Sequence, residues 1–246
     1  MGRFDGRVAL VTGGGRGIGR ATALALAAEG ARVAVTARTE AECEQTARDA
    51  GPSARWFTAD VSDPDSCRAT LDAVREGLGR VELLIHAAGI SPFRGRAENH
   101  SPEVFGEIMD VNLAGAFNVL HAAAPQLLDG GGSVVVVSST LGFSASERLV
   151  AYGASKAGLT HLARTLGREW AGRGVRVNAV CAGYVPTSLT ERMLAVERIH
   201  DELLAEIPMG RLAEVSEIVA PILFLASDDA SYVTGTALVA DGGMAA

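Results

Sequence analysis

The chain has 246 residues, 48% hydrophobic and 21% charged, a composition typical of a globular protein with a large apolar core. A formal net charge of −7 argues against nucleic acids and anionic membranes as partners. Three widely separated cysteines and five histidines without metal-ligand spacing argue against a disulfide framework and a zinc site, and favour a reducing compartment.

Short apolar runs alternate along the chain with longer helical stretches. In chain order, we predict strands at 7–12, 32–36, 54–58, 81–86, 133–138, 175–180 and 237–240. Between them we predict helices at 18–29, 40–50, 63–77 and 150–171, and a long helical region at 102–128 with a bend near Pro125. The strands are continuously apolar, which indicates burial on both faces. This alternation predicts an α/β fold, a Rossmann-like doubly wound parallel sheet of about seven strands with helices on both faces.

No linker, low-complexity tract or internal repeat divides the sequence, so we expect a single domain over residues 1–246. The least regular stretch, 184–210, follows the sixth strand, and we expect it to be a substrate loop because open α/β sheets bind ligands beyond the carboxyl ends of their strands. The first residues, MGRFDGR, lack the apolar segment of a signal peptide, and no run of about 18 apolar residues is present. We therefore expect a cytoplasmic protein.

A glycine-rich segment, TGGGRGIG at residues 12–19, joins the first strand to the first helix. Its GxxxGxG spacing fits neither GxGxxG nor a P-loop, which requires Gly-Lys-Ser/Thr. Glycines let the backbone approach a phosphate closely, and a helix N-terminus offers free N–H groups to it. The segment predicts a dinucleotide pyrophosphate site, with an ordinary glycine-rich turn as the alternative. The candidate contacts are Gly13, Gly15, Arg16, Gly17, Ile18 and Gly19.

The end of the second strand bears on cofactor choice. An NAD site usually carries an acidic residue about 20 positions past the glycines, bonded to the ribose hydroxyls. Residues 35–38 read VTAR and contain no carboxylate. Arg38 can form a charge-assisted pair with a 2′-phosphate, and Arg16 can reach the same group. The pattern favours NADP(H) over NAD(H), and the alternative is two solvated surface arginines.

Tyr152 and Lys156 lie at positions i and i+4 of a predicted helix and therefore share one face. Alone, this pair is also compatible with a partly buried tyrosine beside a solvated lysine. Ser139 lies just past the fifth strand, and Asn112 falls in the preceding helical region. Ketone reduction needs a proton on oxygen, and a lysine ammonium with an oxidised nicotinamide is expected to lower the tyrosine pKa for that purpose. Ser139 can hydrogen-bond the carbonyl oxygen as charge develops.

With these residues in place, the sequence resembles the short-chain dehydrogenase/reductase family over essentially its whole length. Further matching segments are Asp60-Val61, residues 86–89 (HAAG), residues 178–187, Thr234-Gly235 and residues 241–243 (DGG). The resemblance implies that Ser139 polarises the substrate oxygen and that Tyr152 is the acid/base. It also implies that Lys156 lowers the tyrosine pKa and holds the nicotinamide ribose, and that Asn112 holds a water in a proton relay.

The resemblance assigns further cofactor contacts and an assembly. Asp60 and Val61 would contact the adenine, and Ala87, Ala88 and Gly89 would line the cofactor's ribose. Val185 and Thr187 would meet the nicotinamide carboxamide. The family's usual assembly is a homotetramer, for which the helices at 102–128 and 150–171 would form the interface. No metal is implied.

Two positions depart from the family pattern. His86 stands where the family usually has asparagine, and Ala182 stands where it favours proline, which we expect to loosen the backbone beside the nicotinamide. For His86 and Cys181 the favoured interpretation is core packing. Neither departure touches Ser139, Tyr152 or Lys156.

The substrate is less constrained. Residues 207–212, IPMGRL, resemble a segment of 3-oxoacyl-carrier-protein reductases and related keto-reductases, and such segments recur in sugar and steroid dehydrogenases. We therefore expect a reductase that acts on a 3-oxoacyl thioester or a related ketone. A substrate linked to a carrier protein or to CoA belongs to this class. The alternatives are a sugar, steroid or alcohol dehydrogenase working oxidatively and, remotely, a non-catalytic NADP-binding regulator.

The predicted pocket segments are 91–96, 141–148 and 184–207. Their large apolar side chains predict a largely apolar pocket, and they are Phe93, Phe143, Leu149, Leu189, Met193 and Leu194. Arg94, Arg96 and Arg148 can bind an anionic group or a carrier protein, although solvated loop residues are the favoured interpretation.

Overall fold

The computed structural model describes residues 2–246 and, at Arg192, the backbone alone. Seven strands form one sheet in the order β3-β2-β1-β4-β5-β6-β7, and every neighbouring pair is parallel. The strands are β1 (Val8–Thr12), β2 (Arg32–Ala37), β3 (Ala54–Thr58), β4 (Leu83–His86), β5 (Gly132–Ser139), β6 (Val175–Ala182) and β7 (Ala237–Ala240). Because the chain moves outward to β3 and then returns to place β4 beside β1, the strand order reverses between β1 and β4. Ligands bind at such a reversal, beyond the carboxyl ends of the strands.

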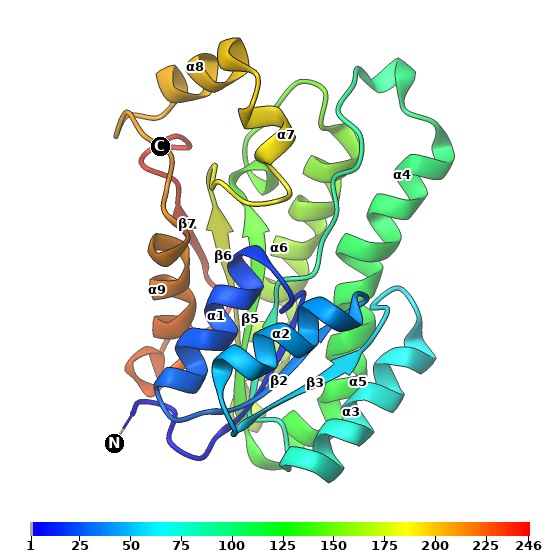
Figure 1. Cartoon of the computed structure of the whole chain (residues 1–246), viewed down its shortest axis with the longest axis vertical. Helices are drawn as coiled ribbons and strands as arrows, with labels where there is room; N and C mark the ends of the chain where they lie inside the picture. The colour runs from blue at the N-terminus through cyan, green and yellow to red at the C-terminus, as the bar shows by residue number, and fades with distance from the viewer. Residues whose placement is uncertain (1) are drawn as a thin grey trace.

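Helices cover both faces of the sheet (Figure 1). One face carries α1 (Gly17–Ala28), α2 (Glu40–Ala50) and α9 (Val215–Ala226), and the other carries α3 (Pro64–Leu78), α5 (Gly115–Gly130) and α6 (Val150–Trp170). Alternate residues of a strand serve opposite layers: Leu10 packs toward the second group of helices, and Val11 toward the first. Both residues are fully buried. The predicted doubly wound α/β fold is confirmed.

Most predicted elements are present with small shifts at their ends, and α2, β3 and β7 have the predicted bounds. The long region predicted at 102–128 is α4 (Pro102–Met109), a π-helical turn over Asp110–Ala114, and α5. We expected the irregularity near Pro125, but that residue lies inside α5. The hydrogen-bond pattern instead changes where Gly115 N–H donates to the Asp110 carbonyl, five residues back.

The stretch at 184–210 is more regular than expected, because it contains α7 (Glu191–Leu194) and α8 (Glu197–Glu206). Helix α8 buries Leu203 and pairs Arg198 with Glu202 one turn apart, which explains why this charged segment is helical. Both short helices lie beyond the carboxyl ends of the strands, at the top of Figure 1.

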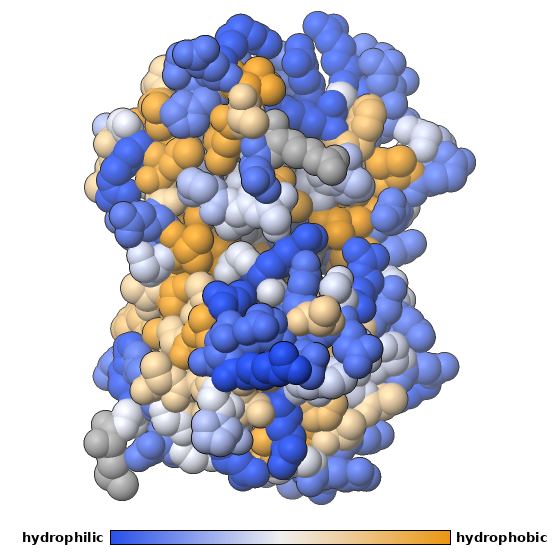
Figure 2. Space-filling view, in the orientation of Figure 1, coloured by the Kyte–Doolittle hydropathy of each residue, from blue (hydrophilic) through white to orange (hydrophobic). Residues whose placement is uncertain are grey.

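The surface of this side of the molecule is mixed in character. Hydrophilic residues cover α2 and α8, whereas hydrophobic residues gather over α9 (Figure 2). Within residues 2–246, no helix combines the length and apolarity that crossing a membrane requires, and no cluster of His, Cys, Asp or Glu is arranged for a metal ion. The three cysteines are buried free thiols.

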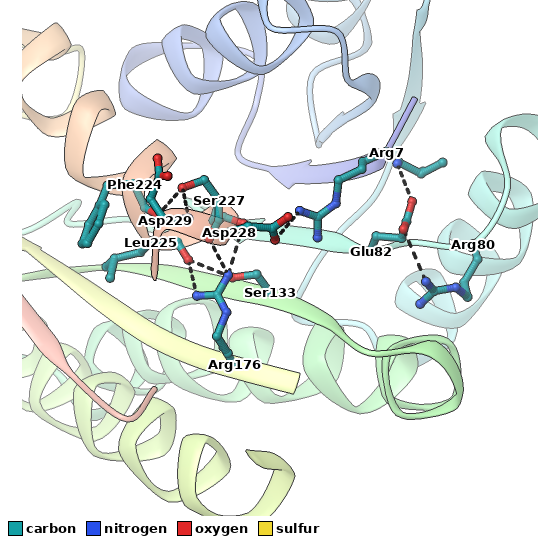
Figure 3. Close-up of polar contacts among 12 residues, drawn as sticks. Arg7, Arg80, Glu82, Ser133, Arg176, Phe224, Leu225, Ser227, Asp228 and Asp229 are labelled. Carbon is teal, nitrogen blue, oxygen red and sulfur yellow. Dashed lines mark hydrogen bonds and ion pairs between the residues drawn. The ribbon is translucent and has the colours of Figure 1, made fainter. Parts of the chain in front are cut away.

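At the opposite end of the sheet, a polar network anchors α9 (Figure 3). The Arg176 guanidinium on β6 donates to the carbonyls of Leu225 (2.7 Å) and Ser227 (2.8 Å), and the Ser133 hydroxyl on β5 donates to Leu225 (2.9 Å). These carbonyls end α9 and have no partner within the helix. Each charged hydrogen bond of this kind contributes about 1.5–3 kcal/mol. The network therefore holds α9 on β5 and β6, on the same face as α1.

Candidate active site

A solvent-open cleft of about 1240 Å³ lies at the carboxyl ends of the central strands. It brings together glycine-loop, second-strand and catalytic candidates that are distant in sequence. The predicted residues that line it are Gly13, Gly15, Arg16, Gly17, Ile18, Gly19, Arg38, Ala87, Ala88, Gly89, Ser139, Tyr152, Lys156, Val185 and Thr187. The predicted residues Asn112, Asp60 and Val61 are not part of this lining.

The glycine loop is closely packed at one side of the cleft. Gly13 has φ +65°, and a Cβ there would lie 2.7 Å from the Ala88 nitrogen. A Cβ at Gly19 would lie 2.2 Å from the Gly13 carbonyl oxygen. Any larger side chain at these two positions would push the loop away from α1 and from the chain that follows β4. The glycines therefore keep the N-terminus of α1 open to the cleft, where its N–H groups can receive a phosphate.

The outer end of the cleft is charged. Arg38, immediately after β2, and Arg16, at the N-cap of α1, both line it. Glu42, in the first turn of α2, lines it as well, and its carboxylate lies 3.9 Å from Arg16. Inspection of residues 35–38 alone missed this carboxylate. The signal that was available is its position four residues after Arg38, on the helix that follows β2 directly.

The catalytic candidates meet at the inner end of the cleft. Ser139 ends β5 and is 8% exposed, and Tyr152 and Lys156 lie in the first two turns of α6. Lys156 is 4% exposed, and its ammonium donates to the Val137 carbonyl at 2.9 Å. The same nitrogen lies 5.6 Å from the centroid of the Tyr152 ring. The predicted serine, tyrosine and lysine are therefore brought together.

Burial is the main influence on the pKa values of both Tyr152 and Lys156. Burial raises the pKa of Tyr152 to about 12, and the hydrogen bond with Ser139 opposes this rise. Burial also lowers the pKa of Lys156 to about 8. In the protein by itself, burial outweighs the other influences on the pKa of Tyr152, whereas the expected lowering of that pKa involves an oxidised nicotinamide as well as Lys156. A neutral, protonated phenol is the form favoured at neutral pH.

Asn112 lies behind the site and is fully buried. Its side-chain oxygen accepts from Ile90 N–H (2.7 Å), and its nitrogen donates to the Ile90 carbonyl (2.9 Å) and to the Ser155 hydroxyl (3.1 Å). Ser155 in turn donates to the Tyr152 carbonyl at 2.7 Å. Asn112 thus joins the chain after β4 to the first turn of α6. Sequence reasoning missed Ser155, whose only signal is its place three residues after Tyr152.

Asp60 and Val61 are held outside the cleft lining. The Asp60 carboxylate accepts from the Ser62 hydroxyl at 2.6 Å and from the Ser62 N–H at 2.9 Å, and these hydrogen bonds lower the pKa of Asp60. Val61 is 8% exposed and packs over Gly115, where a Cβ would come within 2.8 Å of it. Both residues thus make contacts within the protein at the turn after β3.

The two departures from the family pattern have local effects. His86 is fully buried, bonds the Thr12 hydroxyl at 2.9 Å, and has its pKa lowered to about 3 by burial and by Lys156. It is therefore neutral and part of the core, as is Cys181. Ala182 is the last residue of β6, and the next residue, Gly183, donates its N–H to the Ala240 carbonyl of β7 at 2.9 Å.

A smaller pocket opens beside Ser139 and Tyr152. Its predicted members Ser91, Leu141, Tyr184, Leu189 and Met193, together with Leu149, line it. The prediction was wrong for two aromatic residues, since Phe93 instead packs edge-on against His100 and Phe143 is 51% exposed. Leu194, Arg94, Arg96 and Arg148 also lie outside its lining. The lining is largely apolar, as predicted, although Thr140 also contributes to it; the Thr190 hydroxyl is engaged by the Val185 carbonyl and by Thr187 N–H.

The cleft fits a nicotinamide dinucleotide. The N-terminus of α1 and two arginines suit phosphates at one end, and the buried cation of Lys156 with the phenol of Tyr152 suits the ribose and the reacting carbon at the other. When bound, such a cofactor supplies or accepts the hydride.

Comparison with known proteins agrees with this geometry. A family model described as enoyl-(acyl-carrier-protein) reductase matches residues 13–245. The chain is 40% identical to D-threitol dehydrogenase of Mycolicibacterium smegmatis, covering 98% of this chain and 94% of that protein. It is 35% identical to 3-oxoacyl-[acyl-carrier-protein] reductase of Thermotoga maritima, covering 98% and 99%. Among solved structures, levodione reductase superposes with a TM-score of 0.95 at 32% identity, covering 98% of both chains.

Fold, cleft and relatives together define an oxidoreductase that uses a nicotinamide cofactor and acts on CH–OH or C=O groups. The chain belongs to the short-chain dehydrogenase/reductase family.

Proposed function

We propose that this protein is an NADPH-dependent keto-reductase. The observation that carries the proposal is the pairing, within one cleft, of Ser139, Tyr152 and Lys156 at the inner end with Arg16 and Arg38 at the outer end. The two arginines supply the charge that a 2′-phosphate requires. At neutral pH the phenol of Tyr152 carries its proton and can donate it to a carbonyl oxygen in the reductive direction.

In this proposal, each catalytic side chain has one task. The Ser139 hydroxyl donates a hydrogen bond to the substrate oxygen, and Tyr152 donates the proton to it. Lys156 holds the nicotinamide ribose and stabilises the phenolate that remains. Asn112 acts through its bonds to Ile90 and Ser155, which position the first turn of α6. A water held by Asn112 would have to bind elsewhere than on its two side-chain N–H groups, which are both engaged.

The remaining cofactor contacts follow the cleft. In this proposal, Ala87, Ala88 and Gly89, which line the cleft, would contact the ribose, and Val185 and Thr187 would contact the carboxamide. For Asp60 and Val61 to contact the adenine, the adenine ring would have to extend beyond the residues that line the cleft, to the turn after β3. The segment at 184–210 acts as the substrate loop of the single domain.

For the substrate, we favour a 3-oxoacyl thioester or related ketone. Relatives named 3-oxoacyl-[acyl-carrier-protein] reductase and, at 38% identity, acetoacetyl-CoA reductase of Rhizobium meliloti support this class. A second candidate is oxidation of a small polyol or sugar alcohol. The name of D-threitol dehydrogenase and the presence of Ser91 and Thr140 in the pocket lining favour it. Turnover of acetoacetyl-CoA with NADPH compared with turnover of C4 polyols with NADP⁺ separates the two.

Replacing Arg38 with alanine is expected to weaken NADPH binding by about 10- to 100-fold, because a charge-assisted pair with the 2′-phosphate is lost. Binding of NADH should change by no more than about twofold. Nicotinamide fluorescence measures both constants. Arg48→Ala is the matched control, since Arg48 lies on α2 in an exposed pair with Glu44. If wild-type protein binds NADH as well as NADPH, the cofactor assignment is incorrect and the oxidative dehydrogenase becomes the better candidate.

We also propose a homotetramer in the cytoplasm. Phe105 on α4, Phe117 on α5 and Val150 on α6 are 38%, 51% and 43% exposed, on the helices expected at the interface. Exposed apolar side chains on neighbouring elements are typical of an association surface. Three free thiols suit a reducing compartment. Light scattering should give about four times the chain mass of 25.4 kDa, and a monomeric mass would refute the assembly.

A further inference from the structure

The Glu42 carboxylate lies against the glycine loop at the outer end of the cleft. A Cβ at position 15 would lie 2.8 Å from the Glu42 Cβ and 3.2 Å from its Oε2, so this approach depends on Gly15. The other carboxylate oxygen lies 3.9 Å from the Arg16 guanidinium. The Thr46 hydroxyl, one turn further along α2, donates to the Gly15 carbonyl at 3.3 Å. Two side chains of α2 therefore hold the helix, and with it Glu42, against the loop.

This position makes Glu42 a competitor for one of the two arginines. A phosphate monoester carries a charge of about −1.5 to −2 at neutral pH. A phosphate bound to Arg16 would stand beside a second negative charge, because the Glu42 carboxylate lies 3.9 Å from the same guanidinium. A ribose 2′-hydroxyl meets no such opposition, because a carboxylate accepts hydrogen bonds from hydroxyls.

Resting on the proposed function, we propose that Glu42 is a specificity-determining residue. Its carboxylate competes with a 2′-phosphate for Arg16 and narrows the preference for NADP(H) over NAD(H). In this proposal, Arg38 makes NADP(H) bind more tightly than NAD(H), and Glu42 reduces the difference between the two affinities. Both Arg16 (64% exposed) and Glu42 (38% exposed) are partly solvated, so the effect is moderate.

The test replaces Glu42 with glutamine, which keeps the packing on Gly15 and removes the charge. Glu40→Gln is the matched control, because Glu40 lies in the same first turn of α2 but outside the cleft lining. Calorimetry with adenosine 2′,5′-bisphosphate and with AMP measures binding without turnover. We expect Glu42→Gln to tighten the bisphosphate by about three- to tenfold and to leave AMP within about twofold, whereas Glu40→Gln changes both by less than about twofold.

Equal effects of the two glutamine variants would overturn the inference, since a general charge effect would then explain them. Weaker bisphosphate binding by Glu42→Gln would also overturn it and would mean that Glu42 positions Arg16 for the phosphate. The assignment of NADP(H) as the cofactor has a separate test. If Arg38→Ala leaves the ratio of bisphosphate to AMP affinity unchanged, Arg38 does not bind the 2′-phosphate and that assignment is incorrect. The effect of Glu42→Gln on that ratio still decides the role of Glu42.

Discussion

Replacing Tyr152 with phenylalanine is expected to reduce turnover by about 10²- to 10⁴-fold, the usual contribution of a positioned general acid. The substitution removes one hydroxyl from a residue that lies beside Ser139 and over the buried Lys156. Phenylalanine keeps the ring and its packing, so cofactor binding should change by no more than about twofold. Steady-state kinetics with a ketone substrate measures the loss.

The control for this variant is Tyr232→Phe, because Tyr232 is a fully exposed tyrosine outside the site. Circular dichroism and nicotinamide fluorescence should be unchanged in both variants. Turnover above about a tenth of the wild-type rate in Tyr152→Phe would show that another group donates the proton, and the assignment of the acid would then be incorrect.

Replacing Lys156 with methionine is expected to reduce turnover by at least about 10²-fold while maintaining or increasing stability at pH 7. The lysine is buried, and burial lowers its pKa from 10.5 to about 8. At neutral pH, Lys156 is charged in both states, and burial makes this charge less favourable in the folded protein than in the unfolded chain. Methionine removes the free-energy cost of burying this charge, about 1–3 kcal/mol. Loss of the 2.9 Å hydrogen bond to the Val137 carbonyl offsets part of this gain.

The sign of this effect can be checked by pH. Between about pH 8 and pH 10.5 the unfolded chain binds more protons at this position than the folded protein, so wild-type stability rises with pH there. The stability advantage of Lys156→Met should therefore be largest below pH 8 and should shrink as the pH approaches 10.5. Urea unfolding at several pH values measures it. A constant difference across this range, or a variant that is less stable than wild type by more than about 1 kcal/mol at pH 7, would contradict the account.

Local sequence predicted the alternating elements well, because the helical and strand periods are local properties. The β-branched runs of β1 and β5 and the Ala-rich helix after the glycines needed no long-range information. The glycine loop was likewise predictable, since the close contacts of Gly13 and Gly19 follow from a strand, tight turn and helix in succession. The pairing of Tyr152 with Lys156 followed from helical spacing alone.

Other features depended on contacts between segments distant in sequence. Glu42 enters the cleft because α2 packs on the glycine loop through Gly15. Phe143, in the turn after β5, is exposed and is not part of the pocket lining. The pKa directions of Tyr152 and Lys156 depend on burial, which no local pattern specifies. The sequence by itself therefore determined the fold class and the candidates for the reacting side chains, because backbone periodicity and residue chemistry are local. Only the tertiary structure decided the charge balance and solvation of the site, because these depend on which distant segments pack together.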